Sequence, residues 1–315
     1  MTLEDIFWGI PTVQKMYWLV QPAKWLYKLS PELACKVIYR ACCGKKLDLN
    51  YPQTYNEKIQ WLKVYDSTPL KTTLADKYLV KDWVAKRIGD KYIIPTLGVW
   101  DSFDDIDFDE LPQQFVLKAT HGSGMNIIVR NKNTFDISDA RKKYALWLKR
   151  NLGYHTLELH YINITPRIIA EPYIENSGGN IYDYKIHCFN GQPKYIHYIG
   201  ERAQNTTKEV FYDIDWNKLP FITGTYPRFN IDIPKPSNLN ELLQKAAVLA
   251  KDFLYVRVDF YVLNDGSFMF GEMTFAPGSG YYHWNPPEYD KLIGDEIKLP
   301  HQRMDMYDNT RLRDI

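Results

Sequence analysis

The 315-residue sequence lacks a long hydrophobic run, an excess of charge of either sign, and a set of regularly spaced cysteines. Without an uncharged apolar run of about 18 residues or more, no transmembrane helix is expected. The 39 Lys and Arg residues balance 38 Asp and Glu residues, so no global field favours nucleic acid, and no nucleic-acid partner is expected. The four cysteines have no metal-ligand spacing, and adjacent Cys42 and Cys43 make a poor disulfide. We therefore expect a protein of the reducing cytoplasm.

The N-terminal region is helical in pattern and unusual in composition. The first five residues, MTLED, are acidic rather than basic, so no signal peptide is expected. Residues 12–40 interleave tryptophans and aliphatic side chains with lysines and an arginine. Two interpretations stay open: a helical cap packed on the main body, or helices that rest on an anionic membrane surface.

From Asn50 onward, helical and strand patterns alternate, as in a mixed α/β protein. Thr54 followed by Glu57 has capping-box spacing and predicts a helix start. A two-residue turn is predicted at Asn190-Gly191, inside a hairpin over 181–200. Helices are expected over 52–64, 72–87, 135–152 and 238–253, and strands over 115–120 and 167–174.

The stretch FVLKATHGSGMNIIV, residues 115–129, consists of a strand carrying Lys118, a loop with Gly122 and Gly124, and a second strand. Small residues let backbone amides approach a polyphosphate, and a lysine at the strand end supplies charge against it. Alone the signal is weak, because most such glycine loops are hairpin turns. Lys77, in LADKYLVKDWV, is equally ambiguous alone and could be a solvated helix lysine.

The stretch VRVDFYVLNDGSFMFGEMT, residues 256–274, is typical of a hairpin with an acid on each arm. Alternation predicts Arg257 and Asp259 on one face, and the set Phe268, Phe270, Glu272 and Thr274 sharing a face of the second arm. If the hairpin folds about residues 264–266, Asp259 and Glu272 become neighbours. Two carboxylates that close require a cation, and Mg2+ prefers oxygen ligands. The alternative is an Arg257–Glu272 ion pair with a solvated Asp259.

Taken together, these motifs resemble the ATP-grasp superfamily and, most specifically, the TupA-like ATP-grasp family, associated with teichuronopeptide and other surface-polysaccharide biosynthesis. The resemblance covers roughly residues 45–300 and includes Asp76-Lys77, IIAEPYIE at 168–175 and YDYKIHCFNG at 182–191. It implies an α+β ATP-grasp fold, in which two α/β subdomains clasp ATP, with a helical N-terminal extension. The implied units are the extension (1–48), the N-terminal part (49–114), the small ATP-clasping subdomain (115–176) and the C-terminal subdomain with the metal site (177–315).

The resemblance also implies a role for each matching residue. Lys77 and Lys118 correspond to the lysines that contact the nucleotide phosphates, and Lys185 corresponds to a further basic residue facing them. Asp259 and Glu272 correspond to the magnesium carboxylates, Arg257 corresponds to the arginine beside the reacting carbonyl, and Lys118 and Lys185 join it in the catalytic set. The implied nucleotide-binding residues also include the closing loop, His121, Gly122, Ser123, Gly124 and Met125; the adenine-reading segment, Glu171, Pro172, Tyr173 and Ile174; and a ribose ligand, Glu175.

One departure from the family pattern is visible. ATP-grasp proteins usually end the second arm with Glu-x-Asn, and here the residues are Glu272-Met273-Thr274. A threonine hydroxyl is a weaker metal ligand than an amide carbonyl, so the first Mg2+ position is expected and the second stays open.

The implied activity is that of an ATP-dependent carboxylate–amine ligase. A substrate carboxylate attacks the γ-phosphate to make an acyl phosphate, which an amine then attacks. The resemblance suggests a uronic acid of a cell-surface, capsular polysaccharide as the carboxylate and an amino acid or other amine as its partner. The aromatic segment 281–284 suits sugar stacking or packing beneath the preceding loop. Three alternatives stay open: a kinase-like phosphotransferase, a glycosyltransferase, and a nucleotide-binding scaffold without turnover.

The partners expected are therefore ATP with Mg2+, the carboxylate substrate and the amine. A peripheral contact with the inner face of the membrane, or with polysaccharide-assembly enzymes, is a further expectation that follows from the basic and aromatic N-terminal region.

Overall fold

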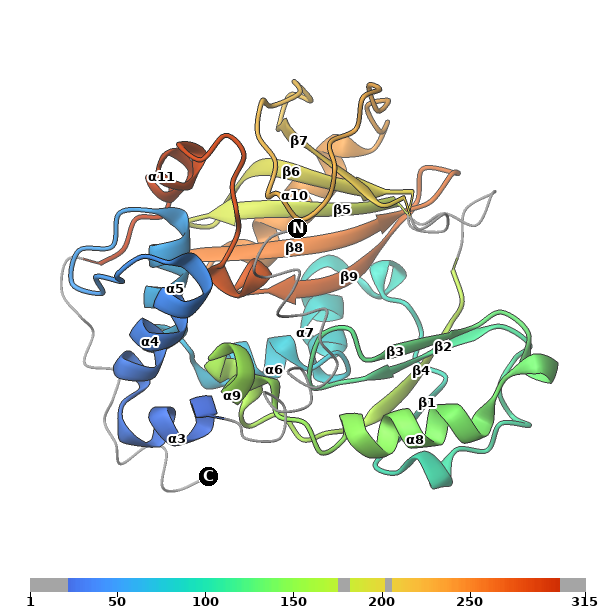
Figure 1. Cartoon of the computed structure of the whole chain (residues 1–315). Coiled ribbons are helices and arrows are strands. Elements are labelled where there is room, and N and C mark those ends of the chain that lie inside the picture. The colour runs from blue at the N-terminus through green and yellow to red at the C-terminus, as the bar shows by residue number, and fades with distance from the viewer. Residues whose placement is uncertain (1–21, 175–181, 202–205, 301–315) are drawn as a thin grey trace.

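The computed structural model describes residues 22–174, 182–201 and 206–300. Within them, two antiparallel sheets face each other, with helices on the outer sides and along one edge (Figure 1). The small sheet has the strand order β1-β4-β2-β3, and the large sheet has the order β7-β6-β5-β8-β9. The fold is α+β, as the sequence predicts.

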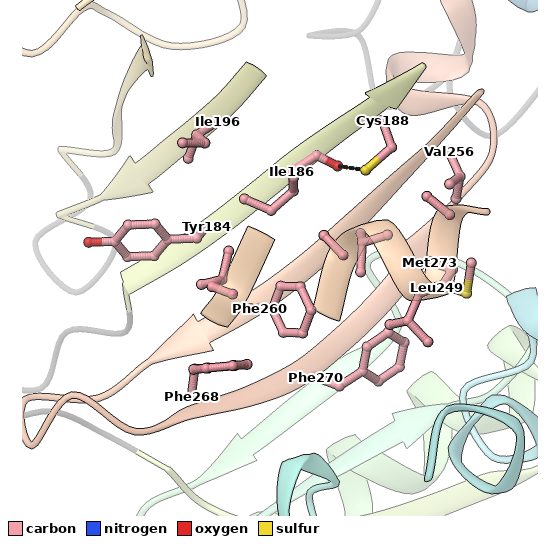
Figure 2. Close-up of a cluster of buried hydrophobic side chains, with 14 of the residues drawn as sticks. Tyr184, Ile186, Cys188, Ile196, Leu249, Val256, Phe260, Phe268, Phe270 and Met273 are labelled. Carbon is pink, nitrogen blue, oxygen red and sulfur yellow. Dashed lines mark hydrogen bonds between the residues drawn. The ribbon is translucent and has the colours of Figure 1, made fainter. Parts of the chain in front are cut away.

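The large sheet is apolar on one face. Its strands are β5 (Tyr182–Phe189), β6 (Gln192–Gly200), β7 (Lys208–Asp213), β8 (Tyr255–Val262) and β9 (Phe268–Thr274). Alternate residues of these strands pack with α10 (Leu239–Ala250) in one buried cluster (Figure 2). Because side chains alternate along a strand, the residues between them point to the opposite face, toward the small sheet.

Two turns fix the register of this sheet. Asn190 and Gly191 both have positive φ, 49° and 81°, as the two central residues of a type I′ hairpin turn require, so the predicted turn is confirmed. In the second hairpin, Asp259 pairs with Glu272, as predicted.

The predicted like-facing set on β9 is wrong in one respect. Pairing jumps from Asp259–Glu272 to Phe260–Phe270, which leaves Gly271 as the extra residue of a β-bulge. Phe268 and Phe270 therefore join the apolar core, whereas Glu272 keeps the opposite face beside Asp259. The bulge thus shifts the alternation along β9. Even-numbered residues before the bulge face the core, and even-numbered residues after it face the polar side.

The small sheet consists of β1 (Gly98–Trp100), β2 (Phe115–Ala119), β3 (Asn126–Val129) and β4 (Ile168–Pro172). On β2, Phe115, Leu117 and Ala119 are fully buried and pack with α8 (Ile137–Trp147), which lies on the side away from the large sheet (Figure 1). Alternation then directs Val116 and Lys118 toward the large sheet. The strand expected at 115–120 is confirmed.

The single helix predicted over 72–87 is wrong. The chain forms two helices, α6 (Pro69–Ala75) and α7 (Leu79–Ile88), separated at Asp76-Lys77-Tyr78. The Asp76 carboxylate accepts hydrogen bonds from the backbone N–H groups of Tyr78 and Leu79 at 2.8 and 3.1 Å, which caps the new helix start. The apolar periodicity continues across the break, so the pattern alone does not reveal it.

The remaining helices line one edge of the two sheets. The predicted capping box at Thr54 and Glu57 is present and begins α5 (Tyr55–Tyr65). The other helices at this edge are α3 (Pro22–Leu29), α4 (Pro31–Cys43), α9 (Leu152–Thr156) and α11 (Tyr289–Gly294). Short 3-10 turns occur elsewhere along the described chain, at Asp90–Tyr92, Phe103–Asp105, Lys132–Thr134, Leu159–Tyr161 and Pro277–Gly280. No helix in the described ranges is both long and apolar enough to cross a bilayer.

Candidate active site

The polar face of the large sheet carries charged residues and a histidine at positions that alternate with the core. Asp183, Lys185 and His187 alternate along β5, and Arg257 and Asp259 alternate along β8. The register places Lys185 opposite Asp259 and His187 opposite Arg257. Directly opposed residues of an antiparallel pair share a face, so these side chains form one cluster.

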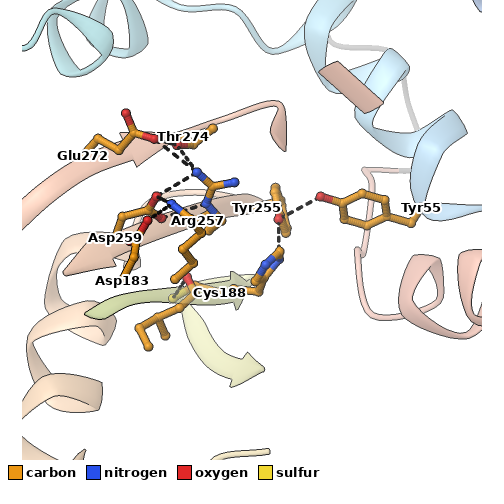
Figure 3. Close-up of polar contacts among 11 residues, drawn as sticks. Tyr55, Asp183, Cys188, Tyr255, Arg257, Asp259, Glu272 and Thr274 are labelled. Atoms are coloured by element: carbon orange, nitrogen blue, oxygen red, sulfur yellow. Dashed lines mark hydrogen bonds and ion pairs between the residues drawn. The ribbon is translucent and has the colours of Figure 1, made fainter. Parts of the chain in front are cut away.

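Three oxygen groups converge on one nitrogen of Arg257 (Figure 3). Its Nη2 donates to Asp259 Oδ2 at 2.7 Å, to Thr274 Oγ1 at 3.0 Å and to Glu272 Oε1 at 3.1 Å. Its Nε also donates to Asp259 Oδ1 at 2.7 Å, which makes the Arg257–Asp259 pair bidentate. Asp259 is 2% exposed. The alternative with a solvated Asp259 is therefore wrong, although the Arg257–Glu272 ion pair that it included is present.

Lys185 lies between two carboxylates. Its Nζ contacts Asp259 Oδ2 at 2.5 Å and Asp183 Oδ2 at 2.8 Å. Burial lowers the pKa of Lys185, but Asp183 and Asp259 outweigh burial and raise it above the ordinary lysine value. The lysine is therefore charged at neutral pH. Asp183, Asp259 and Glu272 set three negative charges against the two cations, Lys185 and Arg257, so this cluster can accept further positive charge.

On the facing sheet, Glu171 holds two lysines. Its carboxylate lies 2.5 Å from Lys118 Nζ and 2.6 Å from Lys81 Nζ. Burial opposes ionisation of Glu171, yet Lys118 and Lys81 outweigh it and lower the pKa of this carboxyl below its ordinary value. The Glu171 side chain therefore fixes the direction of Lys118. This contact is additional to the predicted adenine-reading role of its backbone.

The glycine loop is tied to the joint between α6 and α7. Lys77 Nζ donates to the carbonyl oxygen of Gly122, and the Lys77 N–H donates to Thr120 O at 3.2 Å. The tip, Ser123 and Gly124, is exposed, and Gly124 has a φ of 72°, which favours glycine. At the loop's start His121 is buried, with Nε2 3.0 Å from Trp147 O. His121 is thus packed on α8.

Electrostatic coupling joins the two sheets across the space between them. The pKa of Lys77 is lowered chiefly by burial, and the Glu272 charge is the largest influence that opposes this effect. The same carboxylate also raises the pKa of Lys118 and of Lys185, after nearer groups. The Glu272 carboxylate on β9 therefore influences the pKa of all three lysines that are predicted to face the phosphates. These lysines lie on three separate segments of the chain.

The segment predicted to read adenine lies at the end of β4, which terminates at Pro172. Tyr173 follows, and its hydroxyl accepts a hydrogen bond from Arg130 Nε at 3.1 Å. Ile174 is half-buried, and Glu175 lies outside the described residues. In the aromatic segment 281–284, Tyr282 stacks on Tyr55 with ring centroids 6.1 Å apart, Trp284 is buried and His283 is exposed.

Sequence reasoning missed three contributors to this site: Lys81, Asp183, and a hydrogen-bonded chain beside Arg257. In that chain Tyr55 donates to Tyr255 at 2.9 Å, and the Tyr255 hydroxyl lies 2.8 Å from His187 Nδ1 (Figure 3). Burial lowers the pKa of His187 well below its ordinary value, so the ring is neutral. The alternation of 183, 185 and 187 was the available signal, because it marks one polar strand face. For Lys81 no signal existed, since its partner Glu171 lies on a distant strand.

The family of the chain follows from comparison of its sequence with known families. A model of the TupA-like ATP-grasp family matches residues 57–298, well over half of the sequence, and the chain therefore belongs to this family. The sequence resemblance is confirmed. No curated protein matches the chain.

Among solved structures, three ligases or synthetases illustrate the likeness. An L-amino acid ligase from Bacillus licheniformis has a TM-score of 0.48 at 13% identity, over 87% of this chain and 63% of that one. D-alanine–D-alanine ligase from Bacillus anthracis, complexed with ATP, has a TM-score of 0.38 at 19% identity, over 71% and 63%. N5-carboxyaminoimidazole synthetase from Staphylococcus aureus, complexed with ADP, has a TM-score of 0.40 at 12% identity, over 72% and 53%. The chain thus spans between 53% and 63% of the lengths of these proteins.

The donor set on β8 and β9 fits a magnesium ion. Asp259, Glu272 and Thr274 present only oxygen atoms, and all three already surround one cationic nitrogen. The Glu272 side chain is 41% exposed, so part of it faces open space. Within the described residues, no group of three or more His, Cys, Asp or Glu side chains could hold a metal by itself. A two-carboxylate site is nevertheless usual for Mg2+ that is shared with nucleotide phosphates.

Proposed function

We propose that this protein is an ATP-dependent carboxylate–amine ligase that forms an amide through an acyl phosphate. The observation that carries the proposal is the electrostatic coupling of Lys77, Lys118 and Lys185 to Glu272, which pairs with Asp259 across β8 and β9. Fixed cations on one side and hard oxygen ligands on the other are what a nucleoside triphosphate with its metal requires.

ATP would lie between the sheets. Lys77 and Lys118 would contact its phosphates from the small-sheet side, and Lys185 from the large sheet. The exposed tip of the glycine loop, residues 121–125, would close over the phosphates. The backbone of residues 171–174 would meet the adenine edge, and Glu175 the ribose. In this proposal the small unit (115–176) and the large unit (177–315) clasp the nucleotide, with 49–114 bracing them and 1–48 as an extension.

Asp259 and Glu272 would hold Mg2+, with Thr274 as a hydroxyl ligand or the holder of a water molecule. When bound, the ion would neutralise charge on the transferring phosphoryl group. Arg257 contacts all three of these residues and would lie beside the reacting carbonyl.

The proposed reaction has two steps. The substrate carboxylate attacks the γ-phosphorus, the bond to the β-phosphate oxygen breaks, and ADP leaves. The amine then attacks the acyl carbon, inorganic phosphate leaves, and the amine loses a proton. Negative charge grows on the acyl oxygen in the second step, and Arg257, held rigidly by a bidentate pair, can stabilise it without reorganising.

We further propose that the carboxylate belongs to a uronic acid of a cell-surface, capsular glycan and that the amine is an amino acid or a similar compound. Family membership supports this substrate class. The inward packing of Tyr282 and the burial of Trp284 favour a structural role for that aromatic segment over sugar stacking.

The experiment is a direct search for product. The protein is incubated with ATP, Mg2+ and pairs drawn from a panel of uronic acids and amines, and the mixtures are analysed by mass spectrometry. A product lighter than the two substrates together by one water, formed with equal amounts of ADP and phosphate, supports the ligase. A phosphorylated sugar without amide would establish the kinase-like alternative instead, and ATP left unconsumed under every condition would favour a scaffold.

The glycosyltransferase alternative finds little support in the positions of its usual motif. Asp-x-Asp spacings occur at 105–109 and 213–215. The first lies in a surface turn, and in the second the Asp213 carboxylate accepts hydrogen bonds from the N–H groups of Asp215 and Asn217, closing its own turn. None of these aspartates belongs to the cluster around Arg257.

A further inference from the structure

The outer side of the α3–α4 hairpin has an unusual composition. Between residues 24 and 46, every exposed residue is either basic, apolar or glycine. The exposed cations are Lys24, Lys28, Lys36, Arg40, Lys45 and Lys46, and the exposed apolar residues are Trp25, Leu29, Leu33, Val37 and Ala41. The single acid of the range, Glu32, is half-buried and accepts a hydrogen bond from the Tyr65 hydroxyl at 2.6 Å. Positive charge is thus concentrated here on a chain whose formal net charge is only +1.

The exposed apolar side chains are large and regularly spaced. Trp25 is 69% exposed, Leu29 62%, Leu33 46% and Val37 45%. Residues four apart lie on the same side of an α-helix, so each helix presents an apolar stripe with cations beside it. Burial of these groups against another surface would be favourable, and within the described residues no other part of the chain covers them.

The inner side of the hairpin explains why it holds its position. Ala34, Cys35 and Tyr39 are buried in the core beneath it, and Leu26, Tyr27 and Ile38 pack against that core. Ser30 caps the start of α4, and Gly44 ends it in a left-handed conformation. The helical cap predicted over 12–40 is therefore present from residue 22 onward, where α3 and α4 pack on the core, and residues 12–21 lie outside the described residues. The cap uses only the inner face of the two helices. The other interpretation, that these helices rest on a membrane surface, concerns their outer face.

We propose that the outer side of the α3–α4 hairpin docks on an anionic phospholipid bilayer. Apolar side chains with tryptophan enter the boundary between headgroups and acyl chains, while flanking lysines meet anionic headgroups. Within α3 and α4, four exposed cations without an exposed acid, Lys24, Lys28, Lys36 and Arg40, are complementary to such a surface. A bilayer also accepts a stripe of side chains without the matched pockets that a protein partner must provide.

Docking does not depend on the proposed reaction. For the ligase proposed above, docking would bring the proposed active site to glycans that are attached to membrane lipids. Vesicle binding is measured without nucleotide or substrate, so failure of the ligase assay and failure of docking are separate results.

The test uses the full chain with phosphatidylcholine vesicles that contain or lack phosphatidylglycerol, in co-sedimentation at low and high salt. We expect binding only with phosphatidylglycerol, and weaker binding at high salt. The double variant Lys28→Glu, Leu29→Ser should bind at least about 25-fold more weakly, because each unit of charge near the surface alters the binding constant about fivefold. Trp25→Ala keeps every charge and should weaken binding through the apolar contact alone.

The matched control is Lys142→Glu, Leu146→Ser, which makes the same chemical changes at exposed positions of α8. This control should bind like the wild type, and circular dichroism checks that both double variants are folded. Three results would overturn the proposal: equal binding to vesicles with and without phosphatidylglycerol, no binding to either, or equal losses in the test and control variants. A concentration-dependent dimer that Trp25→Ala abolishes would assign the surface to a second copy of the chain instead.

Discussion

Asp259→Asn and Glu272→Gln remove equivalent charges from the proposed metal site, yet the structure predicts different effects on stability. Asp259 is 2% exposed and binds Arg257 through both carboxylate oxygens and Lys185 through one. Removing one partner of a buried ion pair typically costs ~3–5 kcal/mol. Asparagine keeps the shape and one oxygen, so we expect a loss near ~3 kcal/mol, at the lower end of that range.

Glu272 is in a different environment. Its side chain is 41% exposed, and its contact with Arg257 is a single hydrogen bond of 3.1 Å. Partly exposed pairs contribute ~0–1 kcal/mol. For a chain of this length, the loss at Asp259 corresponds to a drop of ~5 °C in Tm, and the loss at Glu272 to at most ~1–2 °C.

Activity should separate from stability in these two variants. Each removes a hard anionic ligand, so Mg2+-dependent ADP formation should fall in both, on the order of 100-fold or more, the usual scale for loss of one preorganised electrostatic group. Thermal melts without nucleotide and ADP release across a magnesium titration measure the two effects. A wild-type melting temperature for Asp259→Asn would refute the buried-anchor reasoning. Near-normal turnover of Glu272→Gln at limiting magnesium would refute the metal assignment.

Three further predictions concern the binding of ATP by Lys118, the catalytic role of Arg257 and the pH dependence of stability. Lys118→Ala should weaken ATP binding far more than Lys142→Ala, because the first lysine is held by Glu171 on the side of the small sheet that faces the large sheet and the second is exposed on α8. Arg257→Met should suppress amide formation on the order of 100- to 1,000-fold while ADP is still released, and hydroxylamine should trap the stranded acyl phosphate as a hydroxamate. Burial, helped by Lys71 and Lys63, lowers the pKa of His160 to about 3, so below pH 6.5 the unfolded chain binds a proton that the folded chain does not. The free energy of unfolding should therefore fall by ~2.3 kcal/mol from this group between about pH 6.5 and pH 4.5.

Each of these has an outcome that would contradict it. Equal, small effects of Lys118→Ala and Lys142→Ala on ATP affinity would return Lys118 to a structural role. Unchanged amide yield in Arg257→Met would remove the catalytic assignment, and a lower Tm with intact yield would show that the arginine only holds the carboxylates. The variant His160→Gln should lose its part of the acid slope in chemical denaturation; the same slope in variant and wild type would mean that His160 titrates normally in the fold.

Features written into short stretches of sequence could be predicted. The Asn190-Gly191 turn needs two residues with positive φ, and the Asp259–Glu272 pairing follows once the hairpin folds about residues 264–266. The bulge at Gly271 could not be read in the same way. Strict alternation would place Phe270 and Glu272 on the same face of the strand. In the structure Phe270 packs in the core and Glu272 lies on the polar face, and the bulge between them allows both.

Longer-range features escaped for a related reason. The helix break at Asp76 is invisible in the apolar pattern, because the residues on both sides of it keep helical spacing. The contact between Glu171 and Lys118 depends on the register between β2 and β4. The contact between Glu171 and Lys81 depends on the approach of α7, which places Lys81 beside the same carboxylate. Such contacts arise from the packing of separate elements, and no single segment encodes them.

The central claim, that a substrate carboxylate is activated by phosphorylation, has one direct measurement. A carboxylate substrate identified in the panel is labelled with 18O in both carboxylate oxygens and turned over with ATP, Mg2+ and the amine. The oxygen that bonds to the γ-phosphorus must leave with it when the amine displaces phosphate. The account therefore predicts inorganic phosphate carrying one 18O atom and an amide that retains the other. Unlabelled phosphate would contradict the account, as would label in AMP or a phosphorylated product that retains both labelled oxygens.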